Sequence, residues 1–487
     1  MSFTVAIEDV VQENFNGLLS KAAHWPRVRL GELATVTNGV PLPAEAFNPS
    51  KGAPVVRIRN ILDGSTETFF DGPTESSWFI ETGDLLIGMD GDFNAALWRG
   101  PRALLNQRVC MVKPRDGRIT TKFLSYILPG YLQAINKHTP SITVKHLSSR
   151  TVSSLPIPVP PPLEQQALLS QIETQMSRLA ASTHSLTRVI GNIRNARASV
   201  LKAAIEGRLV PNEASIARAE GRGYETASVL LGRVRPASSS RRSTAVGRNE
   251  PTEAVSPVVE LRQLPDGWEW ATVEQVSQAV QYGTSAKCSE EDLGVPVIRM
   301  GNISNGRIKF DDLKFLAINH HEFPAQLLKP GELLFNRTNS AELVGKSAVF
   351  EGYSRPCACA SYLIRIQLNE AAMPAYVSSA INSPHGRVWI KAVMNQQVGQ
   401  ANVNGSKLKA HVIPLPPISE QRRIVAEIDR RLSVLDAVEL TVTTDLARCA
   451  RLRQSILKRA FEGRLLPSRP TATDKRIPQP LSRKTAP

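Results

Sequence analysis

The sequence predicts an α+β protein in which two β-rich domains alternate with two long helices. The first observation is a repeat: a proline-rich segment opens a helical run at Pro156–Gln166 and again at Val412–Arg422. The two runs also close alike, at Leu201–Pro211 and Leu457–Pro467, so both ends are offset by 256 residues (156 against 412, 201 against 457). A period this long indicates a duplicated module of domain plus helix, and therefore a pseudo-two-fold object.

The second observation is a seven-residue apolar repeat inside both helical runs. The two main series are Ile172, Leu179, Leu186, Ile193 and Val200, and Ile428, Leu435, Val442, Cys449 and Ile456. About five heptads in each run are typical of a coiled coil. Arg197 and Arg453 hold the same position in the two runs. Either they form a polar layer that fixes the register, or they are edge residues that reach solvent.

The ends of the two helices follow from proline and glycine. Consecutive prolines keep the entering chain extended and prevent a helix until they end, which places the helix starts at Leu163 and Ser419. Gly207 and Gly463, each followed shortly by a proline, end the helices.

The third observation is a β-rich domain before each helix, with short apolar runs between turn residues. Pro54–Ile61 matches Pro296–Ile303, and Gly83–Ile87 matches Gly331–Phe335. The residues between the first helix and the second domain are basic and rich in serine, which predicts a flexible linker. The expected segments are a first domain at 1–155, a spacer helix at 156–211, a basic flexible linker at 212–262, a second domain at 263–411, a second spacer helix at 412–467 and a disordered tail at 468–487.

The composition favours a polyanionic partner. The 487 residues include 59 Lys and Arg against 44 Asp and Glu, a net charge of +15. Such a balance is typical of nucleic-acid-binding proteins, although it also serves solubility. The five scattered cysteines fit reduced thiols better than a disulfide framework or a metal site. Without a secretory signal or a long apolar run, we expect a cytoplasmic protein.

Catalytic motifs are weak throughout the sequence. Gly345-Lys346-Ser347 ends like a phosphate-binding loop, but the first glycine that such a loop needs is replaced by Ser340. Asn382-Ser383-Pro384-His385 lacks the second proline and the aromatic residue of an amino-methyltransferase motif. We therefore expect no catalytic residue, no cofactor site and no metal site on this chain.

The chain resembles the specificity (S) subunits of type I restriction–modification enzymes. The resemblance is carried by the two proline-rich openers ending in Glu164-Gln165-Gln166 and Glu420-Gln421-Arg422, and by the two closers with Glu-Gly-Arg-Leu. The segments Trp25–Leu33 and Leu264–Trp270 at the starts of the domains add to it. It spans nearly the whole chain, in the family's order.

The resemblance implies a division of labour. It implies two α/β target recognition domains, each reading half of a split, asymmetric double-stranded DNA sequence, separated by a long antiparallel two-helix coiled coil. It further implies that the coiled coil sets the gap and docks two modification (methyltransferase) subunits, with restriction (translocase and nuclease) subunits completing the complex. S-adenosylmethionine, ATP and Mg²⁺ are then expected on those partner subunits, and this chain is a non-catalytic subunit.

Candidate DNA contacts are polar residues near the predicted turns, because Arg suits guanine, Asn and Gln suit adenine, and Lys suits phosphate. In the first domain they are Arg57, Arg59, Asn60, Asn106, Gln107, Arg108, Ser141 and Lys145. In the second they are Arg299, Asn302, Asn336, Arg337, Asn339, Lys346, Gln400, Asn402, Asn404 and Lys407. Each of them has an alternative role as a turn-stabilising or solvated side chain, and the matched Asn60 and Asn302 suit a turn in both copies.

Two alternative functions remain open at this point. The chain could be the recognition part of a split or fused restriction–methyltransferase, although such an enzyme would need a methyltransferase motif on the same chain, and the sequence shows none. It could also be a DNA-binding scaffold without a restriction partner. A purely structural scaffold would need neither two diverged β-rich domains nor a strongly basic surface.

Overall fold

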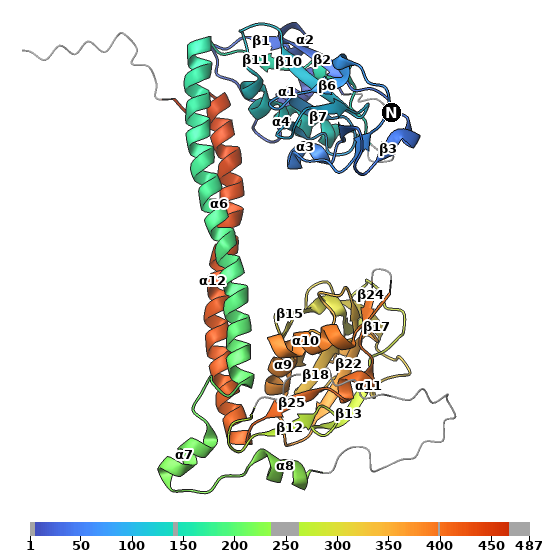
Figure 1. Cartoon of the computed structure of the whole chain (residues 1–487), viewed down its shortest axis with the longest axis vertical. Helices are drawn as coiled ribbons and strands as arrows, with labels where there is room; N and C mark the ends of the chain where they lie inside the picture. The colour runs from blue at the N-terminus through green and yellow to red at the C-terminus, as the bar shows by residue number, and fades with distance from the viewer. Residues whose placement is uncertain (1–4, 140–144, 235–262, 398–399, 467–487) are drawn as a thin grey trace, which may run out of the picture. The chain divides into compact units, whose positions relative to one another are not determined.

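The computed structural model describes residues 5–139, 145–234, 263–397 and 400–466. The chain forms two compact units, residues 1–187 with 443–487 (unit 1) and residues 188–442 (unit 2). Each unit holds one β-rich domain and part of each long helix (Figure 1). We refer to the β-rich domains before the first and second long helix as domain 1 and domain 2.

The two long helices are α6 (Pro162–Ile205) and α12 (Ile418–Phe461), both of 44 residues. Each begins one residue before the expected start, because a proline or its neighbour fits the first turn, where no backbone N–H donor is needed. Both end shortly before Gly207 and Gly463, which adopt φ values of 68° and 70°. This left-handed conformation is open to glycine and stops a helix.

Within each unit α6 and α12 lie side by side and run antiparallel (Figure 1). In unit 1 the start of α6 and the end of α12 share one apolar core, to which Leu168, Ile172 and Phe461 belong. In unit 2 the later part of α6 meets the earlier part of α12, where Arg197 binds Asp436 and Glu439.

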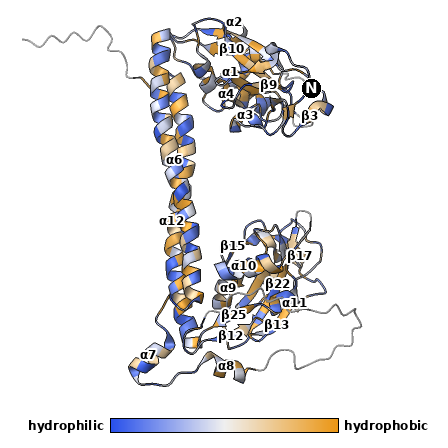
Figure 2. Ribbon diagram, in the orientation of Figure 1, coloured by the Kyte–Doolittle hydropathy of each residue, from blue (hydrophilic) through white to orange (hydrophobic). Residues whose placement is uncertain are grey.

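The seven-residue series lie where the helices pack. Every residue of both series is buried or half-buried. Figure 2 shows hydrophobic and hydrophilic residues mixed along both helices, whereas the strands of the domains are mostly hydrophobic. Arg197 is a buried polar contact, with 13% of its side chain exposed and its guanidinium 2.7 Å from Glu439. Arg453 is exposed instead, so the two arginines at this position have different roles.

Domain 1 contains three sheets. Its four-stranded antiparallel sheet has the order β2-β10-β7-β8, and its five-stranded sheet the order β3-β5-β4-β9-β6. A two-stranded sheet pairs β1 with β11. The strands are β1 (Arg27–Arg29), β2 (Ala34–Asn38), β3 (Phe47–Asn48), β4 (Ala53–Val56), β5 (Phe69–Phe70), β6 (Phe79–Ile80), β7 (Leu85–Gly88), β8 (Ala95–Leu97), β9 (Ala103–Leu105), β10 (Val109–Pro114) and β11 (Pro156–Pro158), and the helices are α1 (Ile7–Glu13), α2 (Leu30–Leu33), α3 (Asn60–Asp63), α4 (Thr121–His138) and α5 (Ser149–Ser153).

Domain 2 repeats the four-stranded order as β13-β22-β18-β20 and the two-stranded pair as β12-β25. Its other sheets have the orders β17-β14-β21, β15-β16 and β19-β24-β23. The strands are β12 (Glu269–Thr272), β13 (Ser277–Tyr282), β14 (Gly294–Ile298), β15 (Ile303–Ser304), β16 (Arg307–Ile308), β17 (Lys314–Ala317), β18 (Glu332–Asn336), β19 (Thr338–Asn339), β20 (Ser347–Phe350), β21 (Ala358–Cys359), β22 (Leu363–Leu368), β23 (Asn395–Gln397), β24 (Gln400–Asn402) and β25 (Val412–Leu415), and the helices are α9 (Pro374–Asn382), α10 (Pro384–Val393) and α11 (Gly405–Lys409).

The central strand of each four-stranded sheet is fully buried. All residues of β7 and of β18 are buried, and each strand follows a glycine with positive φ, Gly83 at 97° and Gly331 at 91°. Strands buried on both faces read as continuous apolar runs, which is why Leu85–Ile87 and Leu333–Phe335 lack the alternation of an exposed strand. These two strands anchor the apolar core of their domains.

A buried glutamine joins each domain to its long helix. The Gln165 side chain accepts a hydrogen bond from Thr120 N at 2.9 Å and donates to Arg118 O at 3.2 Å. Gln421 does the same in domain 2, accepting from Met373 N at 2.8 Å and donating to Ala371 O at 2.9 Å. Thr120 and Met373 cap α4 and α9, respectively. The repeated Glu-Gln dipeptide therefore fixes a helix of the domain to the first turn of the long helix.

The prolines before the long helices also pair as strands. Pro156–Pro158 pairs with Arg27–Arg29, and Val412–Leu415 with Glu269–Thr272. In each domain a buried tyrosine hydroxyl donates to a proline carbonyl of this strand, Tyr131 to Pro156 and Tyr376 to Pro414, both at 2.6 Å. The proline-rich openers thus close the domain as well as delaying the helix.

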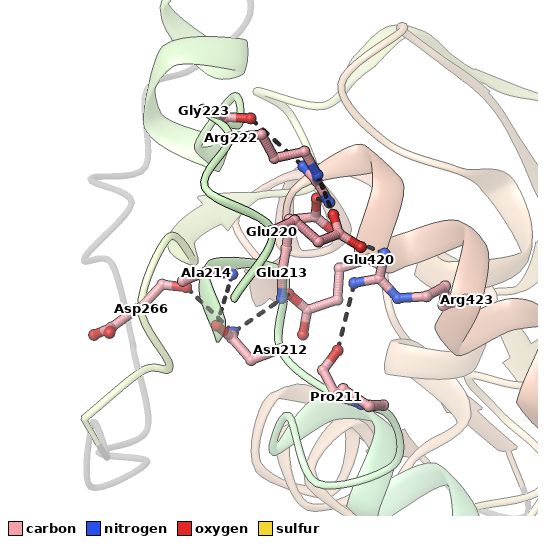
Figure 3. Close-up of polar contacts among 10 residues, drawn as sticks. All are labelled: Pro211, Asn212, Glu213, Ala214, Glu220, Arg222, Gly223, Asp266, Glu420 and Arg423. Carbon is pink, nitrogen blue, oxygen red and sulfur yellow. Dashed lines mark hydrogen bonds and ion pairs between the residues drawn. The ribbon is translucent and has the colours of Figure 1, made fainter. Parts of the chain in front are cut away.

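The start of the expected flexible linker is folded instead. Two short helices, α7 (Glu213–Glu220) and α8 (Ala227–Arg233), occupy it, while the basic run at 235–262 and the tail at 468–487 lie outside the described residues. The helix α7 forms because residues far away in the sequence contact it. Asn212 caps α7 and its side chain lies 3.3 Å from the Glu420 carboxylate at the start of α12 (Figure 3).

The contact between α7 and α12 is a buried ionic cluster (Figure 3). Glu213, with 1% of its side chain exposed, binds Arg222 at 2.7 Å and Arg423 at 2.6 Å. Burial raises the pKa of the Glu213 carboxyl group, but the hydrogen bonds from the two arginines outweigh burial and place that pKa below its ordinary value. Glu213 N also donates to the Glu420 carboxylate at 2.9 Å. A carboxylate with two charged partners stabilises this otherwise short helix.

None of the helices in the described ranges is both long and apolar enough to span a membrane.

Because Gln165 forms the junction and Gln166 does not, we expect alanine substitutions at these adjacent glutamines to change the free energy of unfolding by different amounts. Gln165→Ala leaves Thr120 N and Arg118 O without their partner, so we expect it to lower the free energy of unfolding by about 1–3 kcal/mol. Gln166→Ala is the matched control, because Gln166 is exposed, and its effect should stay within about 0.5 kcal/mol. Urea denaturation followed by circular dichroism measures both. Equal midpoints for the two variants would contradict the proposed role of the junction.

Candidate nucleic-acid interface

Domain 1 and domain 2 each form a surface, and the two surfaces are built in the same way. In domain 1 the chain leaves β7 at Met89, whose N donates to Arg108 O at 2.9 Å and whose O accepts from Leu147 N at 2.7 Å. In domain 2 the chain leaves β18 at Arg337, whose N donates to Tyr362 O at 3.0 Å and whose O accepts from Val403 N at 2.9 Å. The same three segments therefore meet in both domains.

Strand pairing one residue further along extends this equivalence, through an isolated bridge in domain 1 and through β19 with β24 in domain 2. Asp90 pairs with His146 and Thr338 with Asn402, both antiparallel. Three positions are thereby matched: Asp90 with Thr338, Arg108 with Tyr362, and His146 with Asn402. We call this region the paired-turn surface, formed by residues 89–91, 106–108 and 145–147 in domain 1 and by residues 337–339, 360–362 and 401–404 in domain 2.

In domain 1 the paired-turn surface is charged. The Asp90 carboxylate, 14% exposed, binds Arg108 through one oxygen and His146 through the other, both at 2.7 Å. Arg108 and His146 are 57% and 53% exposed, so their remaining donors face solvent. The Lys145 side chain is held within the domain, since its ammonium donates to Asn136 O at 2.7 Å and to the Asn136 side chain at 2.9 Å.

In domain 2 the same surface is aromatic and amide-rich. The Arg337 guanidinium lies 4.7 Å from the centre of the Tyr282 ring, a cation–π contact. Its Nε atom has no hydrogen-bond partner within the described part of the chain. Asn402 donates to the Thr338 hydroxyl at 2.8 Å, and Tyr362 is 47% exposed.

Most of the sequence-based candidates of the second domain gather on or beside this surface. They are Asn336, Arg337, Asn339, Gln400, Asn402, Asn404 and Lys407. Three of them have structural roles: Asn336 is fully buried, Asn404 caps α11 by accepting from Lys407 N at 2.9 Å, and the Lys407 ammonium donates to Val393 O at 2.6 Å. In the first domain Asn106, Gln107, Arg108 and Lys145 lie here, while Ser141 lies outside the described residues.

Asn60 and Asn302 stabilise turns, which is the alternative to a DNA contact that the sequence left open for them. The Asn60 side chain accepts from Arg57 N at 3.0 Å and donates to Ser65 O at 2.8 Å. Asn302, 3% exposed, accepts from Arg299 N at 2.8 Å and donates to Asp311 O at 2.8 Å. In both copies the asparagine side chain accepts from the backbone N–H three residues earlier, so both copies form the same type of turn.

The arginines of these turns differ from one another. Arg57 stacks 4.7 Å from the centre of the Phe47 ring, and Arg299 binds Asp312 at 3.0 Å. Arg59 is exposed where α3 begins. Arg59 is thus the most accessible of the three for an outside partner.

Lys346 lies in another part of unit 2. It lines a cleft of about 720 Å³ between domain 2 and the long helices, together with Arg194, Arg307 and Arg387. Burial lowers the pKa of the Lys346 ammonium, and the charge of Arg387 lowers it further. The Lys346 carbonyl accepts from Asn336 N at 2.8 Å, so its backbone lies beside the residue that precedes Arg337, while its side chain lines the cleft.

Sequence reasoning missed Asp90, His146, Tyr282 and Tyr362. Asp90 could have been found from the match of Gly83–Ile87 with Gly331–Phe335, because this alignment makes the residues after β7 equivalent to those after β18. The other three depend on pairing between segments far apart in the sequence, which short strands do not disclose.

Other side chains of chemical interest in the described ranges are the possible metal ligands and the cysteines. The described residues contain no group of three His, Cys, Asp or Glu side chains that could hold a metal ion. All five cysteines are free, and burial raises the pKa of Cys110 and of Cys359 to about 12. Thiols with such a pKa are unreactive at neutral pH.

The comparison with protein families identifies the class of this protein. Residues 23–187 and 265–444 match the model of the type I restriction modification DNA specificity domain. The two matches together span most of the chain, including both β-rich domains and parts of both long helices. The chain therefore belongs to this family. It is a specificity subunit, the non-catalytic DNA-recognising subunit of a type I restriction–modification system.

Individual relatives agree along nearly the full length. The chain is 28% identical to the EcoBI specificity subunit of Escherichia coli over 96% of this chain and 91% of that protein. It is 24% identical to the EcoKI specificity subunit of E. coli strain K12 over 91% and 89%. A chain from a structural study of type I R-M complex assembly and conformational transition superposes with a TM-score of 0.56 at 18% identity, covering 91% of this chain and 99% of that chain. At this identity, that likeness shows the fold.

The turn role of Asn302 predicts a loss of stability without a loss of specificity. Asn302→Ala removes two buried hydrogen bonds and should lower the free energy of unfolding by about 1–3 kcal/mol. Asn339→Ala is the control in the same domain, since the Asn339 side chain accepts a hydrogen bond only from its neighbour Ser340 in the described contacts, and it should change stability by less than about 0.5 kcal/mol. Denaturation by urea gives both values. A stable Asn302→Ala protein with an altered DNA preference would overturn the turn assignment.

Proposed function

We propose that each domain reads one half of a split, asymmetric sequence in double-stranded DNA. The observation that carries this proposal is the paired-turn surface, where an equivalent backbone frame presents Asp90, Arg108 and His146 in one domain but Thr338, Tyr362 and Asn402 in the other. A shared frame suits a shared task, and different side chains suit different targets, because base edges are distinguished by their donors and acceptors.

The net charge of +15 supports a DNA partner. Lysines and arginines neutralise phosphates and release counterions, so affinity falls steeply as salt increases. Phosphate contacts position a protein on DNA, whereas contacts to base edges supply the specificity. We assign the second task to the paired-turn surfaces and the first to the basic residues around them.

We further propose that the chain is an internal duplication whose helices form an antiparallel coiled-coil spacer. Support comes from the equal lengths of α6 and α12, the shared strand orders and the matched glutamines. A helix of 44 residues is about 66 Å long. Under this proposal domain 1 spans 1–155, domain 2 spans 263–411, and the spacers at 156–211 and 412–467 set the gap between the half-sites.

The same helices would dock two modification subunits. The exposed apolar side chains of α12 include Val434 at 57%, Val438 at 42% and Leu452 at 44%, and apolar surface of this kind suits helix packing by a partner. S-adenosylmethionine would bind to these partner subunits and supply the methyl group. ATP and Mg²⁺ would belong to restriction subunits, where such subunits are present.

Domain exchange tests the proposal. Replacing residues 1–155 with the corresponding domain of a relative should change one half of the methylated sequence and leave the other half and the gap intact, because each domain carries its own paired-turn surface. Single-molecule sequencing of genomic methylation in cells that express the chain with its modification subunits gives the result. Exchange of residues 263–411 is the reciprocal control. A change in both halves after one exchange would contradict independent reading.

A further inference from the structure

The two domains present a guanidinium from opposite members of one hydrogen-bonded residue pair. The pair is Met89 and Arg108 in domain 1, and Arg337 and Tyr362 in domain 2. In domain 1 the arginine is the residue whose carbonyl accepts the bond. In domain 2 it is the residue whose N–H donates the bond. Each domain therefore carries one arginine at this pair, but on different segments of the same frame.

Both arginines are held in place by a neighbour. Arg108 donates from one terminal nitrogen to the Asp90 carboxylate at 2.7 Å, and that carboxylate is itself fixed by His146 at 2.7 Å on its other oxygen. Arg337 lies against the Tyr282 ring, whose hydroxyl accepts from Gly405 N at 2.9 Å. An arginine fixed in this way loses less side-chain entropy when it binds a ligand.

The free donors of both arginines suit one ligand class. A guanidinium has five N–H donors in a planar fork. Arg108 uses one terminal nitrogen on Asp90 and is 57% exposed, which leaves donors for an outside acceptor. The guanine O6 and N7 atoms in the major groove are the acceptor pair that an arginine fork binds most often. Asp90, whose side chain is 14% exposed, holds Arg108 through its carboxylate and would act by positioning it.

We infer that Arg108 and Arg337 each bind a guanine of their own half-site, and that Asp90 is the positioning residue for Arg108. This inference rests on the proposed function, because it requires that both domains bind duplex DNA. Since the two arginines sit on different segments of the frame, the guanine they recognise falls at different places in the two half-sites. This residue pair then accounts for one difference between the two half-sites, the place of the guanine.

The test uses the full-length chain assembled with its modification subunits. Arg108→Lys keeps the charge but loses the fork, so we expect the preference for guanine at one position of the first half-site to fall about 10- to 100-fold. Arg337→Lys should do the same at one position of the second half-site. Total affinity for random duplex and its salt dependence should stay close to the wild-type values, because both variants keep the phosphate-binding charge.

Asp90→Asn separates a positioning role from a structural one. The amide still accepts a bond from Arg108 but loses the charge, so the preference at the Arg108 position should fall about 3- to 10-fold with unchanged thermal stability. Asp116→Asn is the matched control, since Asp116 binds Arg118 at 3.0 Å in an exposed pair of the same domain, and it should leave the methylated sequence unchanged.

The outcomes distinguish this inference from the proposed function. Loss of preference in the expected half, with random-duplex binding retained, supports the inference. If Arg108→Lys leaves the first half-site unchanged, or if Asp90→Asn behaves like Asp116→Asn, the inference is wrong while DNA recognition by the two domains stands. If the wild-type complex shows neither salt-dependent duplex binding nor sequence-specific methylation, the proposed function itself fails.

Discussion

Two buried glutamine side chains, Gln165 and Gln421, hold each β-rich domain to the first turn of its long helix. Each accepts from the N-terminal cap of a domain helix and donates to the carbonyl two residues earlier. A buried amide whose donor and acceptor are both satisfied is costly to disturb, because each separated partner would stay unpaired. The junction therefore restrains the domain on its helix, and the rest of each module is arranged around this restraint.

The strands beside the junction connect it to the candidate interface. The proline-rich strands β11 and β25 close each domain against β1 and β12, and the short helices α5 and α11 lie just before them. The segments before these two helices form one side of the paired-turn surface, and the turns after β7 and β18 form another. Base-reading side chains must be held within a fraction of an ångström to discriminate between donors and acceptors. A repeated frame with exchangeable side chains meets this requirement twice.

The sequence predicted the parts whose signals are local. Prolines and glycines mark the bounds of both long helices to within one or two residues, and the residues of the seven-residue series are buried or half-buried. The helix α7 was missed because Glu213 is stabilised by Arg423, two hundred residues later in the chain. Asp90 and His146 were missed for the same reason, since their contact depends on a pairing between segments 56 positions apart (90 against 146). Asn302 shows the converse, because its polar side chain suited DNA but satisfies a local turn.

The central claim is that the two modules read DNA through equivalent surfaces, the paired-turn surfaces of domain 1 and domain 2. A cryo-electron microscopy structure of the chain with its modification subunits on a duplex carrying the methylated sequence tests this claim most directly. The account predicts that side chains of the paired-turn surfaces approach or support base contacts in both half-sites, those at 90, 108 and 146 in one and those at 337, 338, 362 and 402 in the other. Base contacts made instead from the turns around Asn60 and Asn302, or from segments outside the two paired-turn surfaces, would contradict it.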